Sequence, residues 1–132
     1  MSVVVGIDGS EAAAEALRLA LREARLRRTS LRAVHIWQRH EDEARRLLAD
    51  AVDAAADEAA GIDVEQVLRR DGSPAAGLAE EARGADLLVL GTRGRGGLHE
   101  LLDGSVSLDC RKHAACPVMV VTAPHFASAP PR

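Results

Sequence analysis

Aromatic residues are almost missing from this chain of 132 residues, which has one tryptophan, Trp37, one phenylalanine, Phe126, and no tyrosine. Proteins that bind single-stranded nucleic acids stack bases on such side chains, and this chain offers no platform of that kind. The formal net charge of −3 also argues against general binding to nucleic acids. We therefore expect no nucleic-acid partner.

Long hydrophobic runs are missing as well. No run reaches the roughly 18 apolar residues of a transmembrane helix, so we expect no membrane span. The first residues, MSVVVGIDGS, have no basic segment before their apolar run, and they are typical of a strand rather than of a signal peptide. We therefore expect a cytoplasmic protein.

Cysteine is scarce, since the chain has only Cys110 and Cys116. Their spacing is not CxxC, and we expect two reduced thiols, with a disulfide or redox pair as the alternative. Neither cysteine combines with His99 or His113 in a spacing typical of zinc sites. We therefore expect no metal ion bound by these residues.

The residues that are present indicate one folded domain. Hydrophobic residues make up 47% of the chain and charged residues 28%, which is ordinary for a globular protein. The length favours a single domain. We expect this domain to span residues 1–122, followed by a flexible tail at 123–132 that is rich in proline and small residues.

Strand and helix patterns alternate along the chain. Short apolar runs predict strands at residues 2–7, 31–37, 85–91 and 117–121, and a more polar run at 62–70 predicts a strand near an edge of the sheet. Helical periodicity and capping residues such as Ser10 predict helices at residues 11–28, 41–60, 75–83 and 105–113. This alternation predicts an α/β, Rossmann-like fold: an open parallel five-stranded sheet in the order 3-2-1-4-5, with helices on both faces.

In such sheets a ligand binds beyond the carboxyl ends of the strands, where the strand order reverses. The segments GIDGS and GTRGRGG follow the two strands that meet there, so Asp8 and Gly91 would face each other across the crevice. Gly91 and Gly94 suit a tight turn whose amides bind anions, and Gly104 and Ser105 lie at the start of a predicted helix. From these residues alone, a flexible surface loop remains an equal alternative.

Two better-known phosphate motifs are excluded by spacing. A P-loop requires GxxxxGK followed by Ser or Thr, and no Lys-Ser or Lys-Thr pair is present. A dinucleotide motif, GxGxxG, would begin at Gly94, but its last position is His99.

The glycine-rich stretch nevertheless has a specific pattern. Gly91, Gly94, Gly104 and Ser105 form G-x2-G-x9-G-S, and VVVGIDGS and CPVMVV stand at the two ends of the domain. Together these three motifs resemble the ATP-binding branch of the universal stress protein family, over residues 2–122. The resemblance implies the strand order given above, an adenine nucleotide in the crevice and a homodimer.

The resemblance also implies roles for single residues. It implies that Asp8 contacts the adenosine end of the ligand, that Ile36 lines the adenine pocket and that Leu90 packs on the adenosine. The positions that match ribose and phosphate contacts are Gly91, Gly94, Gly104, Ser105 and Val106. Arg93 is a candidate phosphate clamp, with a solvated arginine as the alternative.

The strand from Pro117 to Val121 is apolar and lies at the predicted edge of the sheet. The resemblance implies that it pairs with a second copy of the chain, and coverage by the tail is the alternative. The segment between the second strand and second helix, residues 38–40, is shorter than is usual in the family. Asp103 stands immediately before Gly104, where a carboxylate would repel phosphate unless a cation lies between them. We therefore expect weak or Mg²⁺-dependent binding of ATP.

Taken together, the sequence predicts an ATP-binding, dimeric sensor or regulator in stress response. The alternative is a dimeric interaction module of the same fold that has lost the nucleotide. We expect little or no catalysis, at most slow ATP hydrolysis, because no P-loop lysine or paired general base is present. A nucleotidyl-transfer enzyme would need a loop such as SGGxDS, which the chain lacks.

Overall fold

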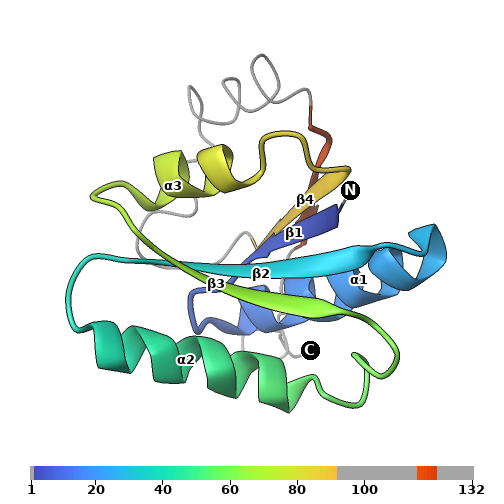
Figure 1. The fold of residues 1–132 in the computed structure, drawn as a ribbon, viewed down its shortest axis with the longest axis horizontal. Helices are drawn as coiled ribbons and strands as arrows, with labels where there is room; N and C mark the ends of the chain where they lie inside the picture. The colour runs from blue at the N-terminus through green and yellow to red at the C-terminus, as the bar shows by residue number, and fades with distance from the viewer. Residues whose placement is uncertain (1, 92–115, 122–132) are drawn as a thin grey trace, which may run out of the picture.

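A parallel five-stranded sheet forms the centre of the protein (Figure 1), seen in a computed structural model that describes residues 2–91 and 116–121. The strands are β1 (Ser2–Gly6), β2 (Ser30–Trp37), β3 (Val64–Arg70), β4 (Leu87–Gly91) and β5 (Val118–Val121). The helices are α1 (Glu11–Arg27), α2 (Glu41–Ala54) and α3 (Pro74–Glu81). The sheet order is β3-β2-β1-β4-β5, which confirms the predicted fold and strand order. The helix expected at 105–113 and the tail expected at 123–132 lie outside the described residues.

Helices cover both faces of the sheet, with α1 and α2 on one side and α3 on the other (Figure 1). Successive side chains of a strand point to opposite faces, so the central strands must be apolar on both. Val3 and Val5 of β1 pack in the cluster under α1 and α2, whereas Val4 packs in the cluster under α3. The β-branched run of β1 is fully buried for this reason.

The triplet Asp-Gly-Ser begins two of the helices in the same way. The Oδ1 atoms of Asp8 and Asp71 accept the backbone N–H groups of Ser10 and Ser73, both at 2.9 Å. Each serine hydroxyl then accepts a backbone N–H from the first turn of its helix, at 3.1 Å in α1 and 3.2 Å in α3. The predicted cap at Ser10 is therefore confirmed, and Ser73 caps α3 by the same contacts.

The second helix is shorter than its apolar periodicity predicts, because it ends at Ala54 instead of continuing to residue 60. Its last turn holds no basic residue. Asp53 and Asp57 instead place carboxylates near the carboxyl end, where the helix dipole favours positive charge. This charge arrangement gives a physical reason for the early end.

Residues 55–61 continue beyond α2 as a series of turns, held in place by α1. The guanidinium of Arg25 donates to the backbone carbonyls of Glu58 and Ala60, at 2.8 and 2.9 Å. Gly61 closes the series with a φ of +81°, a left-handed conformation that favours glycine. Gly61 therefore ends this series of turns. The helix predicted at residues 41–60 has already ended at Ala54.

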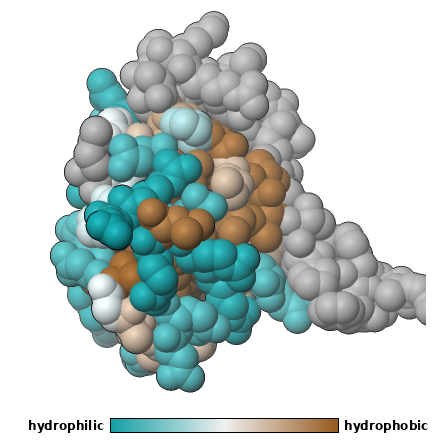
Figure 2. Space-filling model, turned by 90° about the vertical axis from the view of Figure 1, so that its right-hand side faces the viewer, coloured by the Kyte–Doolittle hydropathy of each residue, from teal (hydrophilic) through white to brown (hydrophobic). Residues whose placement is uncertain are grey.

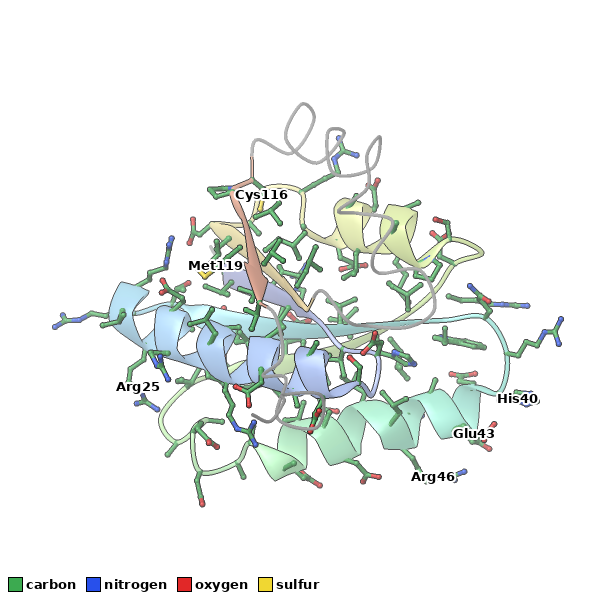
Figure 3. All side chains as sticks on the ribbon, turned by 180° about the vertical axis from the view of Figure 1, so that it is seen from behind. Arg25, His40, Glu43, Arg46, Cys116 and Met119 are labelled. Atoms are coloured by element: carbon green, nitrogen blue, oxygen red, sulfur yellow. The ribbon has the colours of Figure 1, made fainter. Side chains whose placement is uncertain are left out.

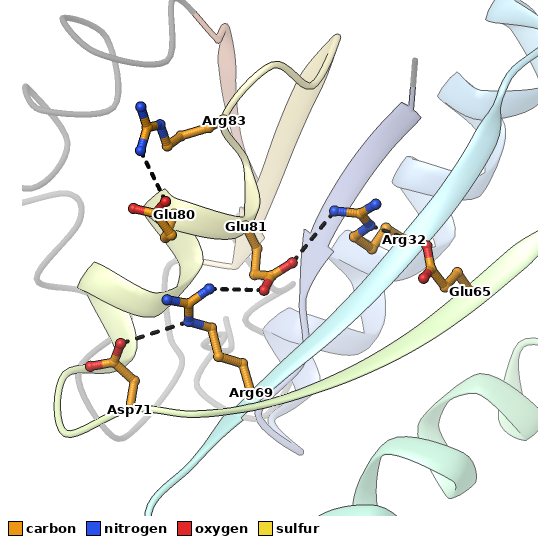
Figure 4. A network of polar contacts seen from close by, with 7 residues as sticks. All are labelled: Arg32, Glu65, Arg69, Asp71, Glu80, Glu81 and Arg83. Atoms are coloured by element: carbon orange, nitrogen blue, oxygen red, sulfur yellow. Dashed lines mark hydrogen bonds and ion pairs between the residues drawn. The ribbon is translucent and has the colours of Figure 1, made fainter.

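A group of charged side chains joins α3 to the two strands beneath its edge (Figure 4). Glu81 accepts from Arg32 of β2 at 3.4 Å and from Arg69 of β3 at 3.0 Å. Arg32 also pairs with Glu65 at 3.2 Å, and Arg69 with Asp71 at 3.7 Å. Single exposed pairs contribute little, but Glu81 is mostly buried and shared, so the group fixes the position of α3 on the sheet.

Hydrophobic surface gathers in patches on the side of the molecule where α1 ends, within a largely hydrophilic surround (Figure 2). Within residues 2–91 and 116–121, the exposed large hydrophobic side chains are Leu26 of α1, 72% exposed, and Val120 of β5, 43% exposed. No helix in these ranges is long and apolar enough to pass through a membrane. Val120 is notable because β5 is an edge strand of the sheet.

Candidate functional site

A crevice of about 440 Å³ opens at the carboxyl ends of β1 and β2, where α2 and α3 begin. The described residues that line it come from the end of β1, the second half of β2 with the link after it, and the first turns of α2 and α3. They are Ile7, Asp8, Val34, His35, Ile36, Trp37, Gln38, Arg39, His40, Glu43, Ala44, Leu47, Pro74 and Leu78. The sequence predicted a crevice between the ends of β1 and β4, with Asp8 facing Gly91. The hollow instead lies at the ends of β1 and β2, and its described lining includes Asp8 and Ile36 but no residue of β4.

Asp8 is the carboxylate that enters the crevice from β1. Its Oδ1 is occupied by the N–H of Ser10, which fixes the side chain in the turn. Its Oδ2 is buried and has no hydrogen-bond partner among the described residues. A buried carboxylate oxygen without a partner is costly, so this atom is suited to accept a hydrogen bond from a ligand.

His35 holds β1 and β2 together at the floor of the crevice. Its Nδ1 lies 2.7 Å from the carbonyl oxygen of Ile7, so Nδ1 carries the proton and donates it. The N–H of Ile7 donates in turn to the carbonyl of Val34 at 2.8 Å, which extends the strand pairing beyond Gly6. His35 is thus a hydrogen-bonded, partly buried histidine with a role in the strand pairing.

The two predicted apolar contacts lie in different places. Ile36 lines the crevice, with 9% of its surface exposed. Leu90 is 1% exposed and packs in the cluster under α3 together with Ile36 and Leu78. Ile36 and Asp8 are therefore brought together in the crevice, whereas Leu90 lies behind its wall.

Gly91, the last residue of β4, is in close contact with the start of α1. A Cβ atom at this position would lie 2.6 Å from the carbonyl carbon and 2.8 Å from the Cβ of Ala12. Both distances are shorter than carbon atoms tolerate, so the glycine permits α1 to pack directly on β4. Gly91 thus has a packing role that the sequence did not predict, beside its predicted ligand contact.

The remaining predicted site residues, Arg93, Gly94, Gly104, Ser105 and Val106, lie outside the described residues. The same holds for Asp103 and for the cysteine, Cys110, that precedes the last strand. The other cysteine, Cys116, is buried, and its Sγ donates to the carbonyl of Pro117 at 3.4 Å. In the part of the chain that the structure describes, no three His, Cys, Asp or Glu residues gather as metal ligands would.

The sequence did not predict that α2 forms the outer wall of the crevice. The link after β2 is short, as expected, so α2 starts at Glu41 and its first turns reach the opening. Glu43 and Leu47 line the crevice from this helix, and His40 lies beside Glu43, with 3.8 Å between Nδ1 and Oε1 (Figure 3). The spacing of positions 43 and 47 places both on one helix face, a signal that could have identified them.

Comparison with known proteins identifies the family. The sequence profile of the universal stress protein family matches residues 1–122. The chain belongs to this family. A universal stress protein of Mycolicibacterium smegmatis is 36% identical over 92% of this chain and 45% of its own length. A universal stress protein of Mycobacterium tuberculosis is 33% identical over 90% of the chain and 47% of its own length. The chain thus spans about half the length of these relatives.

Solved structures of family members have the same fold. A universal stress protein crystallised in complex with cAMP has a TM-score of 0.74 and 28% identity, covering 94% of this chain and 98% of its own. The universal stress protein of Archaeoglobus fulgidus in complex with dAMP has a TM-score of 0.69 and 30% identity, covering 92% and 97%. Both similarities extend over nearly the whole of each chain, and the sheet and helices of the described residues have the fold of these two structures.

Proposed function

We propose that this chain binds an adenine nucleotide, ATP, in the crevice between β1, β2 and the start of α2. As a cytoplasmic, dimeric sensor or regulator in stress response, it would use the bound nucleotide as its signal, with at most slow hydrolysis. Asp8 would contact the adenosine end and Ile36 the adenine. Leu90 would support the adenosine from behind the crevice wall, through Ile36 and Leu78. Gly91, Arg93, Gly94, Gly104, Ser105 and Val106 would hold the ribose and phosphates.

The observation that carries this proposal is the buried Oδ2 of Asp8, which has no hydrogen-bond partner in the described ranges and lies in a crevice of about 440 Å³ with apolar side chains around it. A nucleoside fits this chemistry. The flat faces of its base suit the apolar side chains of Ile36 and Leu78, while its hydroxyl and amino groups can donate to the carboxylate. The volume lies within the range of small-molecule sites. The complexes of two relatives with cAMP and dAMP give independent support for an adenine nucleotide.

Calorimetric titration with ATP, ADP and AMP, each with Mg²⁺ and with EDTA, tests the proposal. We expect a dissociation constant for ATP in the micromolar range or weaker, because binding must exceed the cost of association, and tighter binding with Mg²⁺. GTP is the matched control for the base. Equal, tight binding of ATP in EDTA would contradict the dependence on metal. If no adenine nucleotide binds at millimolar concentration, the proposal is wrong and an interaction module without nucleotide is favoured.

The dimer is proposed to form through the edge strand, Pro117 to Val121. Val120 exposes 43% of its surface there, and an open apolar edge favours pairing with a second chain. We expect Val120→Glu to convert a dimer into a monomer in sedimentation velocity, because a buried charge opposes edge pairing. Leu26→Glu is the control, since Leu26 is more exposed but lies on α1. If the Val120→Glu variant stays a dimer and the Leu26→Glu variant becomes a monomer, the interface involves α1 and not β5.

A further inference from the structure

A second hollow, of about 460 Å³, lies between α2 and the edge strand β3, and we call it the α2–β3 groove. Positions 41, 45 and 48 form one face of α2, and positions 66, 68 and 70 form one face of β3. The residues that line the groove are Glu41, Arg45, Leu48, Gln66, Leu68 and Arg70, with Trp37 at its end. All of them belong to the described part of the chain, and none was predicted to bind a ligand.

The groove has an excess of positive charge. The guanidinium of Arg45 donates to the carboxylate of Glu41 at 2.8 Å, so these two charges balance each other. Arg70 has no carboxylate partner among residues 2–91 and 116–121, and its Cζ lies 5.5 Å from the centre of the Trp37 ring. A cation over an aromatic ring remains able to donate hydrogen bonds at its edge. One guanidinium is therefore available to an anion.

The groove has an apolar part at its inner side. Leu68 is partly buried against the core cluster to which Leu48, 2% exposed, belongs. Trp37 adds a flat aromatic surface next to Arg70. An apolar surface beside a guanidinium with no carboxylate partner in the described part of the chain suits a ligand that has an apolar body and a single, weakly hydrated anionic group. A planar carboxylate fits the fork of a guanidinium, and a doubly charged phosphate would lose more hydration beside Trp37 and Leu68.

We propose that the α2–β3 groove is a second small-molecule site, which binds aromatic carboxylates. The carboxylate pairs with Arg70, and the ring lies against Trp37 and Leu68. The site is separate from the nucleotide crevice, because the two hollows share Trp37 and no other lining residue. The proposal does not depend on nucleotide binding.

Trp37 also supplies the readout. It is the single tryptophan of the chain, and no tyrosine is present, so the intrinsic fluorescence reports on one side chain that faces both hollows. Calorimetric titration of the full chain with 2-naphthoate measures the affinity. Quenching of Trp37 shows whether the probe binds beside the indole. 2-Naphthamide is the neutral probe of the same shape.

We expect saturable binding of 2-naphthoate with quenching of Trp37, and binding of 2-naphthamide that is weaker by about tenfold or more. Arg70→Ala should weaken 2-naphthoate by a similar factor and leave 2-naphthamide unchanged. Arg46→Ala is the matched control, because Arg46 is exposed on α2, points away from the sheet (Figure 3) and does not line the groove. Circular dichroism and the melting temperature establish that each variant folds.

Three results would overturn the proposal. The first is no saturable binding of 2-naphthoate. The second is equal affinity for the charged and neutral probes, or equal losses from Arg70→Ala and Arg46→Ala. The third is direct competition with ATP, in which the apparent dissociation constant of 2-naphthoate keeps rising in proportion to the ATP concentration. Such competition would place the probe in the crevice. If added ATP leaves this dissociation constant unchanged, or shifts it only to a constant value, the result supports two separate sites.

Discussion

Replacing Gly91 with alanine is expected to lower the free energy of unfolding by about 3 kcal/mol, the upper part of the usual range for overpacking. The new Cβ would lie 2.6 Å from the carbonyl carbon and 2.7 Å from the carbonyl oxygen of Ala12. These are backbone atoms of α1, so no side-chain rotation can relieve the contact, and the helix must move away from β4. Equilibrium unfolding in urea measures the effect.

The control for this prediction is Gly72→Ala. Gly72 is exposed in the turn before α3, and a Cβ there would meet nothing within 4 Å. Alanine at this position should leave stability unchanged or raise it by up to about 1 kcal/mol, because it restricts the unfolded chain. Similar unfolding midpoints for the two variants would show that α1 adjusts at little cost, contrary to the packing described above.

Replacing Asp8 with asparagine is expected to weaken the binding of adenine nucleotide by roughly tenfold to a hundredfold, the worth of a hydrogen bond to a charged group. Asparagine keeps an oxygen that can accept from the N–H of Ser10, so the turn before α1 is preserved. It places an amide nitrogen where Oδ2 stands, and this nitrogen cannot accept a hydrogen bond from the nucleoside. Calorimetry with ATP, at fixed Mg²⁺, measures the loss.

Asp71→Asn is the matched control, because Asp71 accepts the N–H of Ser73 at the same distance of 2.9 Å but does not line the crevice. We expect its affinity for ATP to equal that of the unchanged chain. If Asp8→Asn binds ATP as tightly as Asp71→Asn does, the carboxylate of Asp8 has no part in nucleotide binding. Substitutions at Gly91 would answer this question less well, since they also disturb the packing of α1.

The sequence was sufficient for the strand order because each buried strand is a short apolar run and each helix has a periodic face. It also led to Asp8 and Ile36, which both line the crevice because a parallel sheet brings the carboxyl ends of its central strands together, and their contacts with a nucleotide stay a prediction. It failed at the end of α2, where the apolar pattern continues to residue 59 but the helix stops at Ala54. Periodicity records which face is buried, and it does not record the charges that oppose a helix end.

The two hollows beside α2 depend on features that no local pattern contains. The wall of the crevice arises because a link of three residues brings Glu43 and Leu47 to the carboxyl end of β2. The packing role of Gly91 arises from its contact with Ala12. The two residues are 79 positions apart in the sequence (91 − 12). Such contacts are fixed by how helices and strands pack, and a single sequence gives them only after the fold is built.

The repeated Asp-Gly-Ser triplet shows how little a short motif says about function on its own. Asp71 has Arg69 two positions before it, and that arginine pairs with its second oxygen at 3.7 Å. Asp8 has Gly6 at the equivalent place, where a Cβ would lie 2.8 Å from Cδ1 of Leu78, and its second oxygen has no partner among the described residues. A motif search that included the residue two positions upstream would separate a triplet that only starts a helix from one that also leaves an acceptor for a ligand.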